Sequence, residues 1–135
     1  MVFTYPQNVL FKHCDPAGIV FYPRYFEMIN DCVEAFFNDA LATPFHRLIA
    51  AGGVPTVRIE NEFVAPSRHG DRLGLDLSVQ RLGRSSLDLS IIGRCEKEVR
   101  FTCRSTLVRT GPDGRSSPWE PGLRTAMKAY LGEPT

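Results

Sequence analysis

A chain of 135 residues has the length of one domain, and 43% hydrophobic with 23% charged residues is typical of a soluble globular protein. No apolar run approaches the ~18 residues of a membrane span, and the first residues lack the basic flank and apolar stretch of a signal peptide. The formal net charge of +1 argues against a nucleic-acid-binding protein held by bulk charge. We therefore expect one cytoplasmic domain, residues 1–135, with neither membrane nor nucleic acid as a partner.

The chain opens with a strand and a helix. Residues 4–11 fit a first strand, which Pro6 places at a sheet edge because it cannot donate a ladder hydrogen bond. After a loop, Pro23 suits the first turn of a helix, and Pro44 either ends that helix or begins a short second one through Ala50. Apolar residues recur between them at helical spacing: Tyr25, Phe26, Ile29, Cys32, Val33, Phe36 and Phe37. This stripe is too wide for a surface helix, so we expect a long apolar helix surrounded by other elements.

Four later segments alternate apolar and polar residues at period 2, which indicates antiparallel strands with one face on a core. They cover residues 57–63, 73–79, 87–91 and 99–107. After a turn at residues 111–114, residues 121–131 fit a terminal amphipathic helix. The sum is an α+β fold in which a five-stranded antiparallel sheet curls around the helix. A sheet this small has edges to protect, so we expect a homo-oligomer.

Charge is distributed unevenly along the chain. Residues 1–80 carry six Lys or Arg and nine Asp or Glu, a net charge of −3, whereas residues 81–135 carry ten and six, a net charge of +4. A basic second half fits either an anionic partner or chance clustering on a solvated face.

The cysteines predict neither a disulfide framework nor a metal site. Cys14, Cys32, Cys95 and Cys103 form no C-x-x-C pair, and the three histidines complete no zinc-ligand spacing. Without a secretory signal we expect reduced thiols, with Cys32 and Cys103 buried as small hydrophobes.

The loop before the helix carries one carboxylate, Asp15, in a mainly apolar stretch. The free N–H groups and partial positive charge of a helix N-terminus suit a developing oxyanion. A carboxylate beside that point can attack a carbonyl carbon or deprotonate a water that does. The alternative is a structural role, since Asp-Pro is common in turns.

This loop resembles a family signature. Residues 13–21, HCDPAGIVF, followed by Pro23, Tyr25 and Phe26, closely resemble the motif of the 4-hydroxybenzoyl-CoA thioesterase family of the hotdog fold. Residues 54–73, 83–86 and 121–124 resemble the family's second strand and its turn, the next turn and the terminal helix, in the same order. The resemblance covers most of the chain and implies that residues 1–135 form a single hotdog thioesterase domain.

The resemblance implies hydrolysis of an acyl-CoA thioester with an aromatic, benzoyl or hydroxybenzoyl-type, acyl group. The family's catalytic aspartate corresponds to Asp15, and the backbone N–H that polarises the thioester carbonyl corresponds to that of Tyr22. Whether Asp15 acts as a nucleophile or as a general base stays open. Neither route needs a metal or another cofactor.

Other residues are candidates for substrate binding. His13 is placed to orient Asp15 or to contact the substrate. Phe45 corresponds to a position where an aromatic side chain lines the acyl pocket in similar proteins, although it fits the core equally well, and Thr56 is a second candidate to face that pocket. Arg84, in the turn 83–86 with Ser85, is the preferred contact of the coenzyme A phosphates, because guanidinium groups bind phosphate through a planar fork. Further basic candidates are Arg24, Arg81, Arg104 and Arg109.

Two other functions stay open. One is a thioesterase acting on short-chain acyl-CoA, and the other is a non-catalytic acyl-CoA binding or sensing module, which would not need Asp15. A hotdog hydratase would pair an aspartate with a histidine, but His13 is too near in sequence to make that pairing obvious. The predicted assembly is a dimer or a tetramer of dimers.

Overall fold

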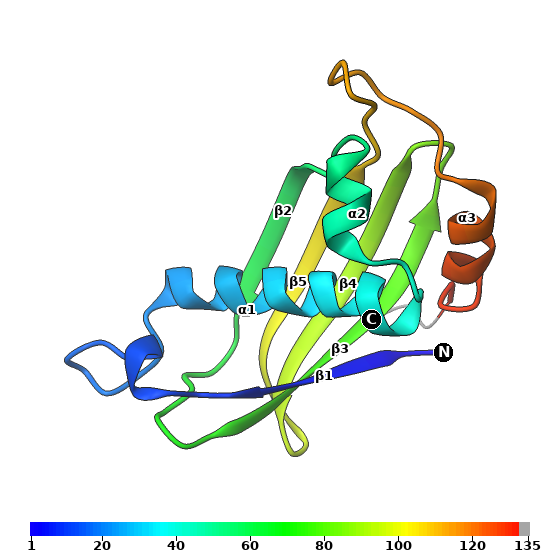
Figure 1. Cartoon of the computed structure of the whole chain (residues 1–135). Helices are drawn as coiled ribbons and strands as arrows, with labels where there is room; N and C mark the ends of the chain where they lie inside the picture. Colours follow the sequence, from blue (N-terminus) through cyan, green and yellow to red (C-terminus); the bar gives the residue numbers. More distant parts are fainter. Residues whose placement is uncertain (133–135) are drawn as a thin grey trace.

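The computed structural model describes residues 1–132, and the last three residues of the expected domain, 133–135, lie outside the described part. Five antiparallel strands form one sheet in the order β1-β3-β4-β5-β2 (Figure 1). The strands are β1 (Phe3–Asn8), β2 (Thr56–Phe63), β3 (Arg72–Leu82), β4 (Ser86–Cys95) and β5 (Glu98–Val108). The helices are α1 (Tyr22–Ala35), α2 (Phe45–Ala50) and α3 (Pro121–Lys128), with short helical turns η1 (Phe11–His13) and η2 (Phe36–Ala40). The predicted α+β fold is confirmed.

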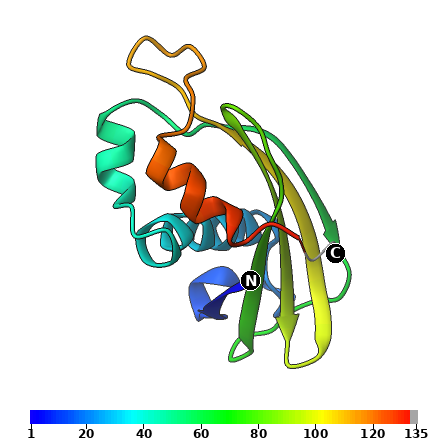
Figure 2. The same cartoon turned by 90° about the vertical axis from the view of Figure 1, so that its right-hand side faces the viewer.

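The helices lie on one side of the curved sheet and leave its other face bare (Figure 2). Alternate residues of the three central strands point toward α1 and form most of the core, as period 2 predicts. The buried set includes Leu73, Leu75, Leu77, Val79, Leu87, Leu89, Ile91, Phe101, Cys103 and Leu107. Pro6 pairs with Gly74 in the edge strand β1, which confirms its predicted edge position.

Helix α1 is shorter and more amphipathic than the sequence suggested. It buries one face, including Tyr25, Met28 and Ile29, while Asp31 and Glu34 on the opposite face are exposed. The expectation of a long apolar helix surrounded on all sides is therefore wrong in this respect. The wide stripe arises because the chain continues after Ala35 into the η2 turn, whose Phe36 and Phe37 enter the core in a different helical geometry.

Strand β2 differs most from expectation. Its apolar residues were expected to face the core, yet Val57, Ile59 and Phe63 are 59%, 40% and 47% exposed. Val57 lies at a register shift opposite β5, so strict alternation fails there. In the described part of the chain β2 pairs only with β5, so its outer edge is open.

The cysteines on the inner faces are buried, as predicted. Burial raises the pKa of the Cys32 and Cys103 thiols to about 12, so both stay protonated at neutral pH. None of the helices within residues 1–132 is long and apolar enough to cross a membrane.

Candidate active site

The loop that carries Asp15 is a small closed hairpin. The N–H of Phe21 donates to the carbonyl of His13, and the N–H of Asp15 donates to the carbonyl of Ile19, both at 2.9 Å. At the tip, the N–H of Gly18 donates to the carbonyl of Asp15, and Gly18 has a φ of +82°, a conformation that favours glycine. The hairpin therefore fixes Asp15 in the segment that leads directly into α1.

The Asp15 carboxylate is half-buried and keeps one oxygen available. Its Oδ1 accepts a hydrogen bond from the N–H of Ala17 at 2.9 Å, whereas no bond to Oδ2 is present among residues 1–132. The helix that follows begins at Tyr22 with no side-chain cap, and Pro23 has no N–H to offer. Because the first N–H groups of a helix lack intrahelical partners, the Tyr22 N–H is available to an incoming carbonyl oxygen.

His13 is turned back into its own segment. The residue is 5% exposed, and its Nδ1 accepts a hydrogen bond from the N–H of Leu10 at 2.8 Å. Burial, followed by the nearby charges of Lys12 and Arg24, lowers its pKa, so the ring is neutral at pH 7. His13 thus holds the base of the hairpin, and only Nε2 is left for any other contact.

Phe45 and Thr56, the two expected acyl-pocket residues, line one cavity. The cavity has a volume of about 450 Å³ and lies between α1, α2, β2 and β5. Most of its wall is apolar, including Phe26 and Val54, while polar groups come from Glu27, Asn30, Thr56 and Ser105.

Within one protomer these groups lie at two ends of β2. Tyr22 lies near its last residue, Phe63, with the two ring centroids 6.1 Å apart, and the hairpin of Asp15 leads directly into Tyr22. Thr56, at the first residue of β2, lies at the cavity end, and the register of β4 and β5 places the turn of Arg84 and Ser85 at that same end.

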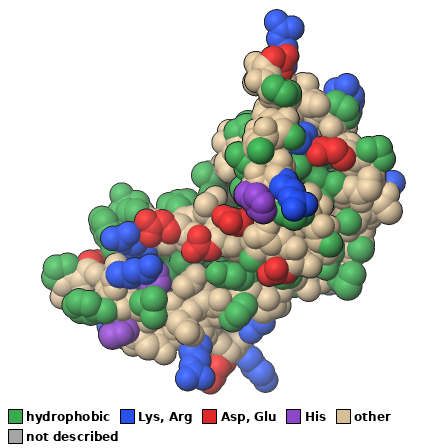
Figure 3. All heavy atoms as spheres, in the orientation of Figure 1, with side chains coloured by type: hydrophobic (Ala, Val, Ile, Leu, Met, Phe, Trp, Pro, Cys, Tyr) green, Lys and Arg blue, Asp and Glu red, His purple; other side chains and the backbone are tan. Residues whose placement is uncertain are grey.

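Aromatic side chains pack between α1 and the end of β2. The ring of Phe63 contacts the rings of Tyr25 and Phe26, at centroid distances of 5.7 and 6.4 Å, and Phe26 also lines the cavity. Apolar side chains also gather on the surface around the start of α1 (Figure 3), where Phe11, Phe21 and Tyr22 are exposed.

The other basic candidates occupy different settings. Arg109 is 4% exposed, pairs with Glu120, and donates to the carbonyl of Leu48 at 2.9 Å, so the expectation that it binds a phosphate is wrong. Its guanidinium instead ties together the loops beside α2 and α3. Arg24 pairs with Glu27 one turn along α1.

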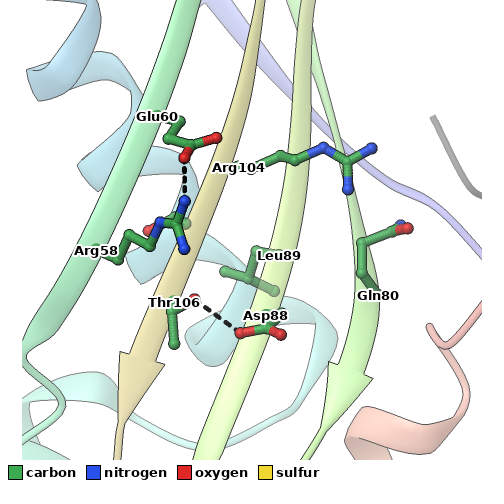
Figure 4. Close-up of a pocket in the computed structure, with 8 residues that line it drawn as sticks. Arg58, Glu60, Gln80, Asp88, Leu89, Arg104 and Thr106 are labelled. Atoms are coloured by element: carbon green, nitrogen blue, oxygen red, sulfur yellow. Dashed lines mark hydrogen bonds and ion pairs between the residues drawn. The ribbon is translucent and has the colours of Figure 1, made fainter.

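Arg104 lies on the sheet face opposite the helices (Figure 4). The neighbouring groups on that face are polar and partly paired with one another, as in the ion pair of Arg58 with Glu60 and the hydrogen bond from Thr106 to Asp88. The shallow pocket that these residues line on the sheet surface lacks the apolar wall of an acyl pocket. Arg84 is exposed at its turn.

Sequence reasoning missed Asn30 and Ser105, which line the cavity with the predicted residues. Helical spacing could have identified Asn30, because Phe26, Asn30 and Val33 share one face of α1. Residues 1–132 contain no cluster of three His, Cys, Asp or Glu side chains arranged as metal ligands.

A family model described as Thioesterase superfamily matches residues 17–102. The chain therefore belongs to the thioesterase superfamily, and its activity is thioester hydrolysis. The matched region begins two residues after Asp15 and covers most of the sheet together with α1 and α2.

Particular relatives are similar over different shares of the chain. The chain is 25% identical over 114 residues to a 4-hydroxybenzoyl-CoA thioesterase from Pseudomonas sp. (strain CBS-3), covering 82% of this chain and 71% of that protein. It is 28% identical over 79 residues to a 1,4-dihydroxy-2-naphthoyl-CoA hydrolase from Synechocystis, covering 57% and 56%. The solved structure of a gentisyl-coenzyme A thioesterase matches with a TM-score of 0.85 and 26% identity, over 93% of this chain and 99% of that chain. The hotdog thioesterase fold predicted from the motif is confirmed.

Proposed function

We propose that this chain hydrolyses acyl-CoA thioesters with an aromatic acyl group, using Asp15, and that residues 1–135 form one hotdog thioesterase domain. The observation that carries the proposal is the closed hairpin, which delivers a carboxylate with a free oxygen directly ahead of an uncapped helix N-terminus. The reaction consumes one water and releases the free acid and the coenzyme A thiol.

The chemistry follows from the hairpin. The Tyr22 N–H binds the thioester oxygen and stabilises the negative charge that develops on it. Asp15 either attacks the carbonyl carbon, giving a mixed anhydride that water then hydrolyses, or removes a proton from the attacking water. Both routes expel the thiolate of coenzyme A and use the same carboxylate.

The acyl group fits the cavity beside Phe45 and Thr56. Its volume of about 450 Å³ lies within the ~300–1,000 Å³ of small-molecule sites. The apolar wall suits an aromatic ring, and Asn30 with Thr56 can bind a polar ring substituent. The names of the relatives, which act on 4-hydroxybenzoyl-CoA, 1,4-dihydroxy-2-naphthoyl-CoA and gentisyl-CoA, support an aromatic acyl group of this kind.

We propose that the site is shared between two protomers. Thr56 and Phe63 lie seven steps apart along β2, about 23 Å at ~3.3 Å per residue, so the Thr56 wall of the cavity is remote from the hairpin of its own protomer. If the open edge of β2 pairs antiparallel with the same edge of a second copy, Phe63 of each protomer approaches Thr56 of the other, at a strand spacing of about 4.8 Å. The hairpin of one protomer then faces the acyl cavity of its partner.

Exposure along β2 supports this homodimer. All residues of β2 except Asn61 are exposed, including the apolar Val57, Ile59 and Phe63. The dimer is the unit we propose, and a tetramer would be a pair of such dimers. We place the protein in the cytoplasm, where its thiols stay reduced.

Replacing Arg84 by alanine is expected to raise KM for coenzyme A esters about 5- to 20-fold, because an exposed guanidinium that binds a phosphate contributes mainly to ground-state binding. A truncated thioester without the nucleotide should keep its KM. Lys97→Ala, at the opposite end of the sheet and also exposed, is the control. Equal loss on both substrates would assign Arg84 no phosphate contact.

The substrate proposal is tested by thiol release from 4-hydroxybenzoyl-CoA, benzoyl-CoA and butyryl-CoA. We expect kcat/KM at least about 10-fold higher for the aromatic esters, since the cavity wall discriminates by apolar contact. A preference for butyryl-CoA would favour the short-chain alternative, and binding of all three esters without turnover would favour a binding module.

A further inference from the structure

Segment 64–71, which follows β2, is the support against which the catalytic hairpin rests. The N–H of Val20 donates to the carbonyl of Ser67 at 2.8 Å, and Ile19 forms a backbone bridge with Arg68. Ser67 is fully buried, although it lies in a loop. The position of the hairpin therefore depends on the position of this segment.

One side chain of β5 holds the segment together. The guanidinium of Arg100 is 12% exposed, and its Nη1 donates to the carbonyl of Pro66 at 3.1 Å, to Oγ of Ser67 at 3.2 Å and to Oδ2 of Asp71 at 2.7 Å. The carbonyl of Arg100 also accepts hydrogen bonds from the N–H groups of residues 64 and 65. Arg100 thus fixes the segment at its start, middle and end.

The ion pair in this network persists at neutral pH. The hydrogen bond from Arg100, followed by one from the N–H of Arg68, lowers the pKa of the Asp71 carboxyl below its ordinary value. The oxygen Oδ2 of Asp71 therefore accepts from both groups as a carboxylate, and it closes the segment into a loop. Nothing in this network reaches Asp15 directly, and its effect passes through Ser67 and Val20.

We propose that Arg100 is a positioning residue for catalysis, which sets the geometry of the Asp15 hairpin through segment 64–71. This inference rests on the proposed role of Asp15. Displacement of a reacting group by about 1 Å can cost up to ~100-fold in rate, so a support of this kind acts on turnover more than on binding.

The test compares Arg100→Gln with Arg94→Gln. Arg94 is the matched control, because it pairs with Asp76 at 2.6 Å on the neighbouring strands and makes no contact with segment 64–71 within the described residues. At a temperature where both variants are folded, we expect R100Q to lower kcat about 10- to 100-fold with KM within about threefold, and R94Q to match the wild type. Arg100→Lys, which keeps a cationic donor, should recover most of the loss.

Hydrogen exchange gives a readout that does not depend on activity. Deuterium uptake of the peptide that covers residues 13–21 should rise in R100Q and stay at the wild-type level in R94Q and R100K. Unchanged kcat or unchanged uptake in R100Q, or an equal effect of R94Q, would overturn the proposal. If R100Q does not fold, the same deuterium uptake is measured in Ser67→Ala and R100K. Uptake by residues 13–21 should then rise in S67A and stay at the wild-type level in R100K. If Asp15→Asn proves active, the proposed function fails, while the exchange result still decides the link between Arg100 and the hairpin.

Discussion

Replacing Asp15 by asparagine is expected to lower kcat on an aromatic acyl-CoA at least about 100-fold, on the scale of losing a positioned acid–base or nucleophilic group. Asparagine keeps the shape of the side chain and an oxygen that accepts from the Ala17 N–H, so the hairpin should fold as before. KM should stay within about threefold, because the carboxylate acts on the reacting carbon rather than on binding. Steady-state thiol release on the purified variant measures both constants.

The chain contains a close control for this substitution. Asp113 accepts a hydrogen bond on Oδ1 from the N–H of Arg115 at 3.0 Å, the same turn that Asp15 makes with Ala17, but it lies in the exposed loop 111–118. Asp113→Asn should therefore leave kcat unchanged. Near-normal turnover of the Asp15 variant would move the catalytic role to another group.

The central strands of the sheet and the location of the Asp15 loop were predictable from sequence, because both leave local signals. Alternation at period 2 located β3, β4 and β5, since each buries one face against the core of its own chain. The hairpin carries a contiguous motif in which two residues have a clear conformational role. Gly18 adopts a positive φ, and Pro23 lies in the first turn of α1. These features depend on residues that are close to one another in sequence.

Features set by distant contacts were not predictable in this way. Alternation in β2 showed that one face is apolar, but it does not say whether the covering surface belongs to the same chain. From sequence alone, Arg109 cannot be distinguished from a surface charge. The fold places Glu120 and the Leu48 carbonyl beside it. The role of Arg100 has the same origin, because its acceptors lie about 30 residues earlier in the chain.

The proposed sharing of each site between two protomers predicts complementation between two inactive variants. Asp15→Asn removes the carboxylate, and Asn30→Trp fills the acyl cavity from the exposed face of α1 with an indole ring. Each homodimer should lose at least about 100-fold in kcat/KM, since every site then lacks either its carboxylate or its cavity. In a heterodimer, one site combines both defects, and the other combines an intact hairpin with an intact cavity.

The most direct measurement is therefore thiol release by the purified heterodimer, obtained by co-expression with two different affinity tags. We predict about half of the wild-type activity per dimer, from one restored site of two. A heterodimer as inactive as both parents would contradict the account, because it would place Asp15 and the acyl cavity of each site within a single protomer.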